Sequence, residues 1–221
     1  MLTLIVPVLN ESELITPFLS SLQPLRHSGC EVIVVDGGST DNTVALATPL
    51  ADSVIHSDKG RGRQMNTGAA QATNDILLFV HVDNVLPANL VELVTSNCHS
   101  GNWGFFQVQL SGNHPLFRMI ETCMNARSRL TGVATGDQCL IVGGELFINA
   151  GGFPDIPLME DVAFSKTLKQ YVSPVIITEK VITSSRRWEQ HGIIKTILQM
   201  WWLRLLYFLG VSPERLVKSY Y

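Results

Sequence analysis

The sequence predicts an α/β fold, with a mainly parallel central sheet and helices on both of its faces. Through the first half of the 221-residue chain, short and nearly continuous apolar runs alternate with longer segments of helical spacing. Apolar strands of this kind are buried on both faces, and their alternation with helices is typical of parallel sheets. Ligands of such sheets bind outside the carboxyl ends of the strands. Functional residues are therefore expected directly after the predicted strands.

The elements of the first half follow one another in a regular order. Residues 2–9 form the first predicted strand, and Asn10 with Glu13 three residues later resembles a capping box that opens a helix. A Gly-rich turn follows the second strand. The other predicted elements of this half are strands over 30–36, 52–56 and 76–81, and helices from about residue 41 and over 63–72.

The second half is less regular. Residues 103–110 are predicted as a strand, residues 116–130 have helical spacing, and residues 139–142 form a further short strand. No internal repeat, low-complexity tract or Ser/Pro-rich linker interrupts the chain, which favours a single domain. Residues 1–190 are assigned to this domain, and residues 191–221 to an apolar helical extension of it.

Composition and charge exclude several classes of protein. The chain is 46% hydrophobic and 16% charged, and its formal net charge of -3 gives no general attraction to nucleic acid. The four cysteines form no CxxC pair, which favours reduced thiols in a cytoplasmic protein over a disulfide framework or a zinc ribbon. Met1 leads into an apolar run with neither a basic segment nor a cleavage site, so no secretory signal is expected.

The turn VVDGGSTDNT, residues 34–43, allows two interpretations. Asp36 ends a strand, two glycines permit a tight turn, and the polar residues after them are suited to cap a helix, so local structure alone explains the motif. The functional interpretation is a nucleotide pocket in which Asp36 accepts a hydrogen bond from a base N–H. The helix N-terminus nearby would then suit an anionic group.

The segment KGRGRQMNTG, residues 59–68, places Arg61 and Arg63 among glycines. A guanidinium binds phosphate through two parallel hydrogen bonds, so these arginines are candidates for the phosphates of a nucleotide. The segment nearly spells a dinucleotide fingerprint, but Met65 stands in place of the third glycine. The alternative is an ordinary solvated basic loop.

The stretch ILLFVHVDN, residues 76–84, ends a buried strand with two polar groups, His81 and Asp83. If the extended conformation continues through Val82, the two side chains project to the same side. The Asp83 carboxylate is suited to bind Mg²⁺ or Mn²⁺ together with substrate phosphates. For His81 three interpretations stay open: a metal ligand, a hydrogen-bond donor beside the metal, or a hydrogen-bonded core histidine.

Glu160 and Asp161 follow Pro157 and begin a helical pattern, so both carboxylates are expected in the first turn of a helix. There the helix dipole stabilises negative charge, which explains the acidic pair without any function. The functional alternative makes Asp161 a general base, which requires an ionised side chain that points into the crevice.

Six spaced segments combine into a larger pattern: IVPVLNE (5–11), VDGGSTDNT (35–43), MNTGAAQA (65–72), HVDN (81–84), GGFPD (151–155) and MEDVAFS (159–165). Together and in this order they resemble a family-2 glycosyltransferase with the GT-A fold, over residues 3 to about 190. Segments of the form HxD, TGDQ, PLMED and RRWE resemble a smaller bacterial subgroup of that family.

The resemblance implies roles for individual residues. Asp36 matches a carboxylate that binds the base, with Ser39 and Asp41 beside it. Asp83 matches the last acid of a metal-binding DxD motif, and Asp161 matches the base of an ED motif. Further positions implied around the nucleotide are Pro7, Asn10, Glu11 and Asn66, and candidates for the acceptor or a phosphate are Asp137, Gln138, Glu160, Arg186, Arg187 and Trp188.

Three positions depart from the family pattern. His81 stands where the family has its first DxD acid, and Gly37 replaces the second carboxylate of the DDGS turn of many relatives. Ser184 stands at the glutamine position of the QxxRW motif of processive synthases, so a single sugar transfer is expected rather than polymerisation. The alternatives for residues 186–188 are a surface pair of arginines and a core tryptophan.

The function implied by the resemblance is metal-assisted transfer of one sugar from a nucleotide-diphosphate sugar, with a UDP-sugar favoured, to an unknown acceptor hydroxyl, with inversion. Mn²⁺ or Mg²⁺ at Asp83 would neutralise the charge of the leaving diphosphate, while Asp161 takes the acceptor proton. The alternatives are a nucleotidyltransferase, or a non-catalytic protein that binds nucleotides.

The apolar segment 193–211 approaches the thickness of a bilayer at ~1.5 Å per residue. Lys195 and Arg204 fall on opposite sides of a helical wheel, and an arginine at the bilayer centre costs roughly 2.5–3.5 kcal/mol, so spanning is disfavoured. An interfacial helix that places Trp201 and Trp202 on the inner face of a membrane competes with a packing or dimer face.

Overall fold

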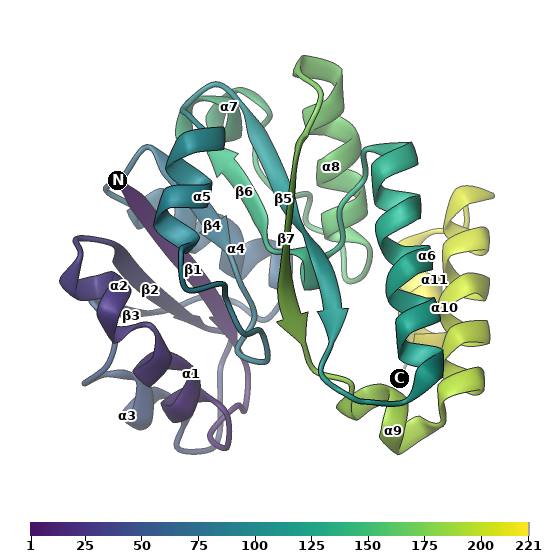
Figure 1. Cartoon of the computed structure of the whole chain (residues 1–221). Helices are drawn as coiled ribbons and strands as arrows, with labels where there is room; N and C mark the ends of the chain where they lie inside the picture. The colour runs from purple at the N-terminus through teal and green to yellow at the C-terminus, as the bar shows by residue number, and fades with distance from the viewer. Residues whose placement is uncertain (221) are drawn as a thin grey trace.

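The computed structural model of the chain describes residues 1–220, with the backbone alone for Arg187 and Tyr220. Its central feature is a seven-stranded sheet with the order β3-β2-β1-β4-β6-β5-β7 (Figure 1). β6 runs antiparallel to both of its neighbours, and the other adjacent pairs are parallel. The predicted α/β fold with a mainly parallel sheet is confirmed. The strands are β1 (Leu2–Val8), β2 (Glu31–Asp36), β3 (Ser53–His56), β4 (Ile76–Phe79), β5 (Trp103–Leu110), β6 (Leu140–Gly143) and β7 (Val175–Thr183).

Helices cover both faces of the sheet, as the sequence predicts. Alternate side chains of β1 enter different clusters: Leu4 and Val6 pack with Leu19 on one face, and Ile5 packs with Phe164 on the other. The helices of the first face are α1 (Ile15–Ser21), α2 (Gln23–His27), α3 (Thr43–Ala47) and α5 (Leu90–Asn97), and those of the second are α4 (Arg61–Gln71), α7 (Gly144–Asn149) and α8 (Glu160–Tyr171).

A third group of helices packs beyond the carboxyl end of β5. There Val108 and Leu110 form a cluster with Phe117 of α6, and Ile193 and Ile197 of α10 pack against it. The C-terminal helices are thereby joined to the rest of the molecule through α6 (Figure 1). These helices are α6 (Pro115–Thr131), α9 (Arg186–His191), α10 (Ile193–Phe208) and α11 (Pro213–Tyr220).

Within the described part of the chain, none of the helices combines the length and the apolar character that a membrane crossing requires. The exposed face of α10 carries Trp201 and Trp202, which are 62% and 57% exposed. Contact of this face with a membrane surface or with a second copy stays a prediction, and so does the division of the chain at residue 190.

The predicted capping box at Asn10 and Glu13 is wrong. Helix α1 begins only at Ile15, and its N-cap, Leu14, makes no side-chain cap. Asn10 has a φ of 55°, in the left-handed region, and its side chain accepts a hydrogen bond from the Thr40 backbone N–H at 2.8 Å. Asn10 therefore connects the loop after β1 to the loop after β2. Because its side chain is engaged in this contact, it does not cap α1.

The strand predicted over residues 76–81 is also shorter than expected, since β4 ends at Phe79. Residues 81–84 form a turn: the Asn84 backbone N–H donates to the His81 carbonyl at 3.1 Å, and the Asn84 side chain accepts from the His81 backbone N–H at 3.0 Å. His81 and Asp83 are therefore positioned by a turn and not by the alternation of an extended strand.

Candidate active site

Two adjoining cavities open at the carboxyl ends of β1 and β4. The small cavity, about 120 Å³, lies between the loop after β1 and the start of α4. The large cavity, about 220 Å³, lies between the 3-10 helix η1 (Gly136–Gln138), the N-terminus of α8 and helix α10. Arg61 and Asp83 line both cavities, so these two residues mark the place where the cavities meet.

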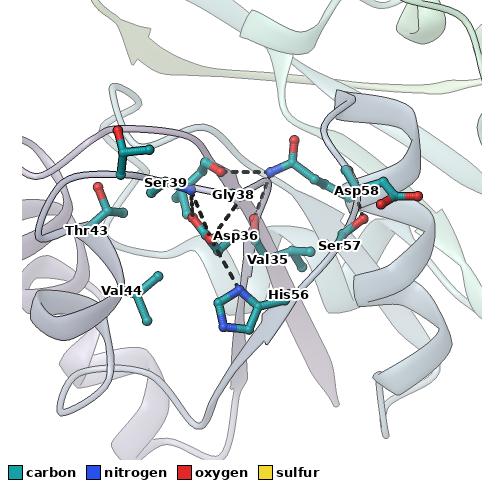
Figure 2. Close-up of polar contacts among 12 residues, drawn as sticks. Val35, Asp36, Gly38, Ser39, Thr43, Val44, His56, Ser57 and Asp58 are labelled. Carbon is teal, nitrogen blue, oxygen red and sulfur yellow. Dashed lines mark hydrogen bonds and ion pairs between the residues drawn. The ribbon is translucent and has the colours of Figure 1, made fainter.

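The loop after β2 is held by the carboxylate of Asp36 (Figure 2). Its oxygens accept hydrogen bonds from the backbone N–H groups of Gly38 and Ser39 at 3.1 Å, and the imidazole of His56 lies 3.3 Å away. Only 1% of Asp36 is exposed, and the residue lines neither cavity. The carboxylate predicted to bind a base therefore uses its acceptor oxygens within its own turn.

The carboxamide of Gln64, from α4, reaches the small cavity beside this turn. Its Nε2 donates to the backbone carbonyls of Val8 and Val35, both at 2.8 Å, so both of its N–H bonds are used. This pairing fixes the amide with Oε1 directed away from the two carbonyls. Gly37 leaves room for it, because a Cβ at that position would lie 3.0 Å from the Gln64 carboxamide.

The turn after β4 brings Asp83 and His81 to the cavities. Burial raises the pKa of the Asp83 carboxyl, and the guanidinium groups of Arg61 and Arg186 oppose this shift. Burial, together with Arg61, lowers the pKa of His81 to about 3, so its imidazole is neutral at physiological pH. Among residues 1–220, no three His, Cys, Asp or Glu side chains group closely enough to hold a metal ion by themselves.

Asp161 lies at the N-terminus of α8 and faces the large cavity. Its Oδ2 accepts from the Gly136 N–H and its Oδ1 from the Val162 N–H, both at 2.6 Å, which holds the carboxylate in one orientation. A Cβ at Gly136 would lie 2.7 Å from His81 Nε2 and 3.8 Å from Asp161 Oδ2, so only glycine fits between the two side chains. Asp83 and Asp161 line the same cavity.

Glu160 precedes Asp161 and is buried, with 6% of its surface exposed. Burial, followed by the charge of Asp161, raises the pKa of Glu160 from 4.5 to about 7. Between pH 4.5 and about pH 7, Glu160 is protonated in the folded protein and has lost its proton in the unfolded chain. Folding stability therefore falls as the pH rises through this window, and the loss is complete above about pH 7.

Replacing Glu160 by glutamine is expected to remove this loss. The stability of Glu160→Gln relative to the wild type should rise by on the order of 1–3 kcal/mol between pH 5 and pH 8. Urea unfolding at both pH values measures the difference. Glu145→Gln, an exposed glutamate in the first turn of α7, is the matched control. A pH dependence no larger than that of the control would contradict the assignment.

The two arginines of the KGRGR segment lie in different places. Arg61 lines both cavities. Arg63 forms a bidentate salt bridge with Asp155, with Nε to Oδ1 at 2.7 Å and Nη2 to Oδ2 at 2.8 Å, and lines neither cavity. The position of Arg63 therefore does not support the phosphate role expected for it, because its guanidinium is engaged at the surface.

Three other residues expected in the site serve the scaffold instead. Asn66 exchanges two hydrogen bonds with the backbone of Phe153, each at 2.8 Å. The Ser39 hydroxyl accepts from the Asn10 N–H at 2.9 Å. Gln138 is fully buried, and its Nε2 donates to the backbone of β5 at 3.2 Å. None of these side chains lines either cavity, so their polar groups hold loops and strands together.

The large cavity also has residues that sequence analysis missed. Met200 and Arg204 of α10 line it, although their segment suggested only membrane contact or packing. Helix α10 reaches the cavity by packing against the cluster formed by α6, which no local sequence signal indicates. The side chain of Arg187 lies outside the described residues. Besides Arg61, His81, Asp83 and Asp161, the expected residues that line the cavities are Pro7, Glu11 and Arg186 in the small one, and Asp137, Glu160 and Trp188 in the large one.

Known proteins match part of the chain in sequence. The model of glycosyl transferase family 2 matches residues 3–138. A PGL/p-HBAD biosynthesis glycosyltransferase of Mycobacterium bovis is 34% identical over 93 residues, which cover 39% of this chain and 36% of that protein. An uncharacterized glycosyltransferase of Nostoc sp. is 28% identical over 91 residues, which cover 38% of this chain and 28% of that protein. The chain thus matches 36% and 28% of the length of these two relatives.

Solved structures match a larger part of the chain. A mannosyltransferase from Pyrobaculum calidifontis, in complex with GDP-Man and Mn²⁺, superposes with a TM-score of 0.62 at 25% identity, over 82% of this chain and 56% of its own. Residues 1–349 of TarS from S. aureus, in complex with UDP-GlcNAc, superpose with a TM-score of 0.65 at 20% identity, over 83% of this chain and 58% of their own. With more than half of its length matched by the family model, the chain belongs to glycosyl transferase family 2 and has the GT-A fold.

Proposed function

We propose that the chain moves one sugar from a nucleotide-diphosphate sugar to an acceptor hydroxyl, with inversion at the anomeric carbon. The observation that carries the proposal is that Asp83 and Asp161 line one cavity of about 220 Å³, which meets a smaller cavity at the end of β1. The mannosyltransferase of similar structure holds GDP-Man and Mn²⁺, which supports a nucleotide-sugar donor. The small cavity would hold the nucleoside, and the junction would hold the diphosphate.

The donor set at the junction fits a hard divalent cation. Asp83 offers carboxylate oxygens, and Mg²⁺ or Mn²⁺ commonly takes one or two protein carboxylates and completes its shell with phosphate oxygens and water. When bound, the cation would neutralise negative charge on the departing diphosphate. Arg61, which lines both cavities, supplies a fixed positive charge at the same place. The neutral imidazole of His81 lies in the wall of the small cavity beside this pair.

Asp161 would act as the general base. The N–H groups of Gly136 and Val162 orient its carboxylate at the wall of the large cavity, where the acceptor would lie. The acceptor hydroxyl gives its proton to Asp161 as its oxygen bonds to the anomeric carbon, and the bond to the diphosphate breaks on the opposite face. This geometry inverts the configuration. Ser184, at the position where processive synthases have glutamine, lines the same cavity.

Gln64 is assigned to the base of the donor. Gln64 lines the small cavity, no described hydrogen bond uses its Oε1, and the two carbonyls that bind Nε2 fix the orientation of the amide. An N–H donor such as N3–H of uracil would satisfy it. The carboxylate of Asp36, the residue first expected in this role, accepts hydrogen bonds from its own turn and lines neither cavity, and Gly37 supplies the space that Gln64 occupies.

Wild-type protein is expected to bind UDP about tenfold more tightly than N3-methyl-UDP, since a buried acceptor left unpaired costs about 1–3 kcal/mol. Gln64→Met should bind both nucleotides equally, because it lacks the acceptor. Isothermal titration calorimetry measures the four affinities. Gln71→Met, at an exposed glutamine of the same helix, is the matched control and should keep the discrimination. Discrimination that survives in Gln64→Met would exclude Gln64 as the base contact.

Product analysis tests the proposed reaction itself. Purified protein is incubated with UDP- and GDP-sugars, with and without Mn²⁺, and the released nucleotide is identified. Release of a nucleoside diphosphate supports glycosyl transfer or its water-dependent side reaction. Consumption of a nucleoside triphosphate with release of pyrophosphate identifies a nucleotidyltransferase instead. Binding of nucleotide without turnover of any donor identifies a non-catalytic protein.

A further inference from the structure

An apolar groove of about 450 Å³ runs between α6 and α10, next to the large cavity. Its walls include Ile120 and Cys123 of α6 and Ile197 and Trp201 of α10. We propose, on the basis of the function proposed above, that this groove binds the apolar chain of an amphiphilic acceptor. The acceptor's hydroxyl would lie at Asp161, and an anionic group near that hydroxyl would lie between the groove and the large cavity.

Continuity with the large cavity is the first argument. Met124, Asp137, Trp188, Met200 and Arg204 line both the groove and the large cavity. A molecule that places a hydroxyl at Asp161 therefore has an open path along α10 into the groove. The path begins with polar side chains at η1 and continues between apolar ones, as a polar head followed by an apolar chain requires.

The charge where the groove meets the large cavity is the second argument. Arg127 and Arg204 both line the groove. Arg127 Nη2 donates to the Gln138 side chain at 3.3 Å, but its Nε is buried without a partner, and Arg204 has no described hydrogen bond or salt bridge. Burial, followed by the charge of Arg204, lowers the pKa of Arg127 to about 10. The carboxyl groups of Asp161 and Asp137 oppose this shift, so the two guanidinium groups have acidic neighbours. The unpartnered Nε of Arg127 and the guanidinium of Arg204 are still hydrogen-bond donors suited to a phosphate or a carboxylate.

The single exposed cysteine provides a direct probe of occupancy. Cys123 lines the groove and is free and exposed, whereas Cys30, Cys98 and Cys139 are buried. Decyl phosphate, kept below its micelle concentration, should slow the reaction of Cys123 with a thiol reagent at least tenfold in full-length protein. The affinity should fall roughly fourfold for each methylene removed, as apolar burial requires. Reaction of Cys123 at the same rate with and without decyl phosphate would overturn the proposal.

A charge variant tests the anionic group. Decyl phosphate and decanoate distinguish phosphate from carboxylate, and decanol has the same chain without charge. Wild-type protein should prefer one of the two anions to decanol about tenfold, because a charge-assisted hydrogen bond is made. Arg204→Gln should lose this preference and still bind decanol. Lys195→Gln, an exposed cation of the same helix, is the control that should keep it. Equal affinity for all three probes in the wild type would remove the anionic part of the proposal.

Donor turnover, measured in parallel, separates this inference from the proposed function. Release of nucleoside diphosphate from a nucleotide sugar in water depends on the small cavity and the junction, and it does not require the groove. Donor turnover without protection of Cys123 would overturn the proposal of an amphiphilic acceptor and would still support glycosyl transfer. Protection of Cys123 without turnover of any donor supports a groove for amphiphiles and counts against glycosyl transfer.

Discussion

Asp161→Asn is expected to lower the rate of sugar transfer by ~10²–10⁴, the range typical of losing a general base. Asparagine retains one oxygen that accepts from a backbone N–H, but it cannot take the acceptor proton. Donor binding should be unchanged, because Asp161 lines the large cavity and not the small one. Single-turnover transfer measures the rate, and calorimetry with the nucleoside diphosphate measures donor binding.

Asp137→Asn controls for the replacement of a carboxyl group by an amide in the same cavity. Burial and the carboxylate of Asp83 raise the pKa of Asp137, and Arg61 opposes the shift. The substitution replaces a buried carboxyl group without removing the base, so its effect on transfer should be the smaller of the two. An equal fall in both variants would assign the Asp161 effect to the loss of a carboxyl group from this cavity and count against proton transfer to Asp161.

Asp83→Ala is expected to abolish the stimulation of donor turnover by Mn²⁺ and to lower turnover by ~10² or more, since removal of one stabilising group at a developing charge typically costs this much. The carboxylate lies where the two cavities meet, so its loss removes the expected metal ligand between nucleoside and sugar. Calorimetry with UDP, with and without Mn²⁺, gives a second measurement: the gain in affinity from Mn²⁺ should disappear.

Asp58→Ala is a suitable control, because Asp58 is an exposed carboxylate directly before the basic segment 59–68. Its carboxylate lies 3.8 Å from the guanidinium of Arg63. It removes the same side chain outside both cavities, so its metal stimulation should match that of the wild type. Mn²⁺ stimulation that persists in Asp83→Ala would show that the cation is held by other residues or is absent from the reaction.

Much of the fold follows from the sequence because its strands are buried on both faces. Residues 103–110, predicted as a strand, are strand β5 with the same limits, and all but one of its residues are buried. β7 gave no such signal: three consecutive residues, Thr178 to Lys180, are exposed, as an edge strand permits. Strand β3 lies at the other edge of the sheet and was still predicted, over residues 52–56. β7 was missed because the middle of the strand faces solvent and interrupts the apolar pattern.

The place of the site was also predictable, since ligand sites of parallel sheets lie at the carboxyl ends of strands. Arg61, Asp83 and Asp161 meet there. The individual contacts were not predictable. Asp36 and Asn66 carry polar groups typical of binding residues, but these groups are hydrogen-bonded to backbone N–H groups of nearby turns. Gln64 gives no local signal, because its position depends on two carbonyls from different strands and on the missing side chain of Gly37.

The two bonds between Asn66 and Phe153 and the pair of Arg63 with Asp155 have a consequence for motion. They connect α4 to the segment that leads into α8 through four hydrogen bonds, so they oppose motion between the element that bears Arg61 and the element that bears Asp161. If the cavities close over a bound sugar, we expect the movement in the opposite wall, where α9 and α10 carry Arg186, Trp188 and Arg204.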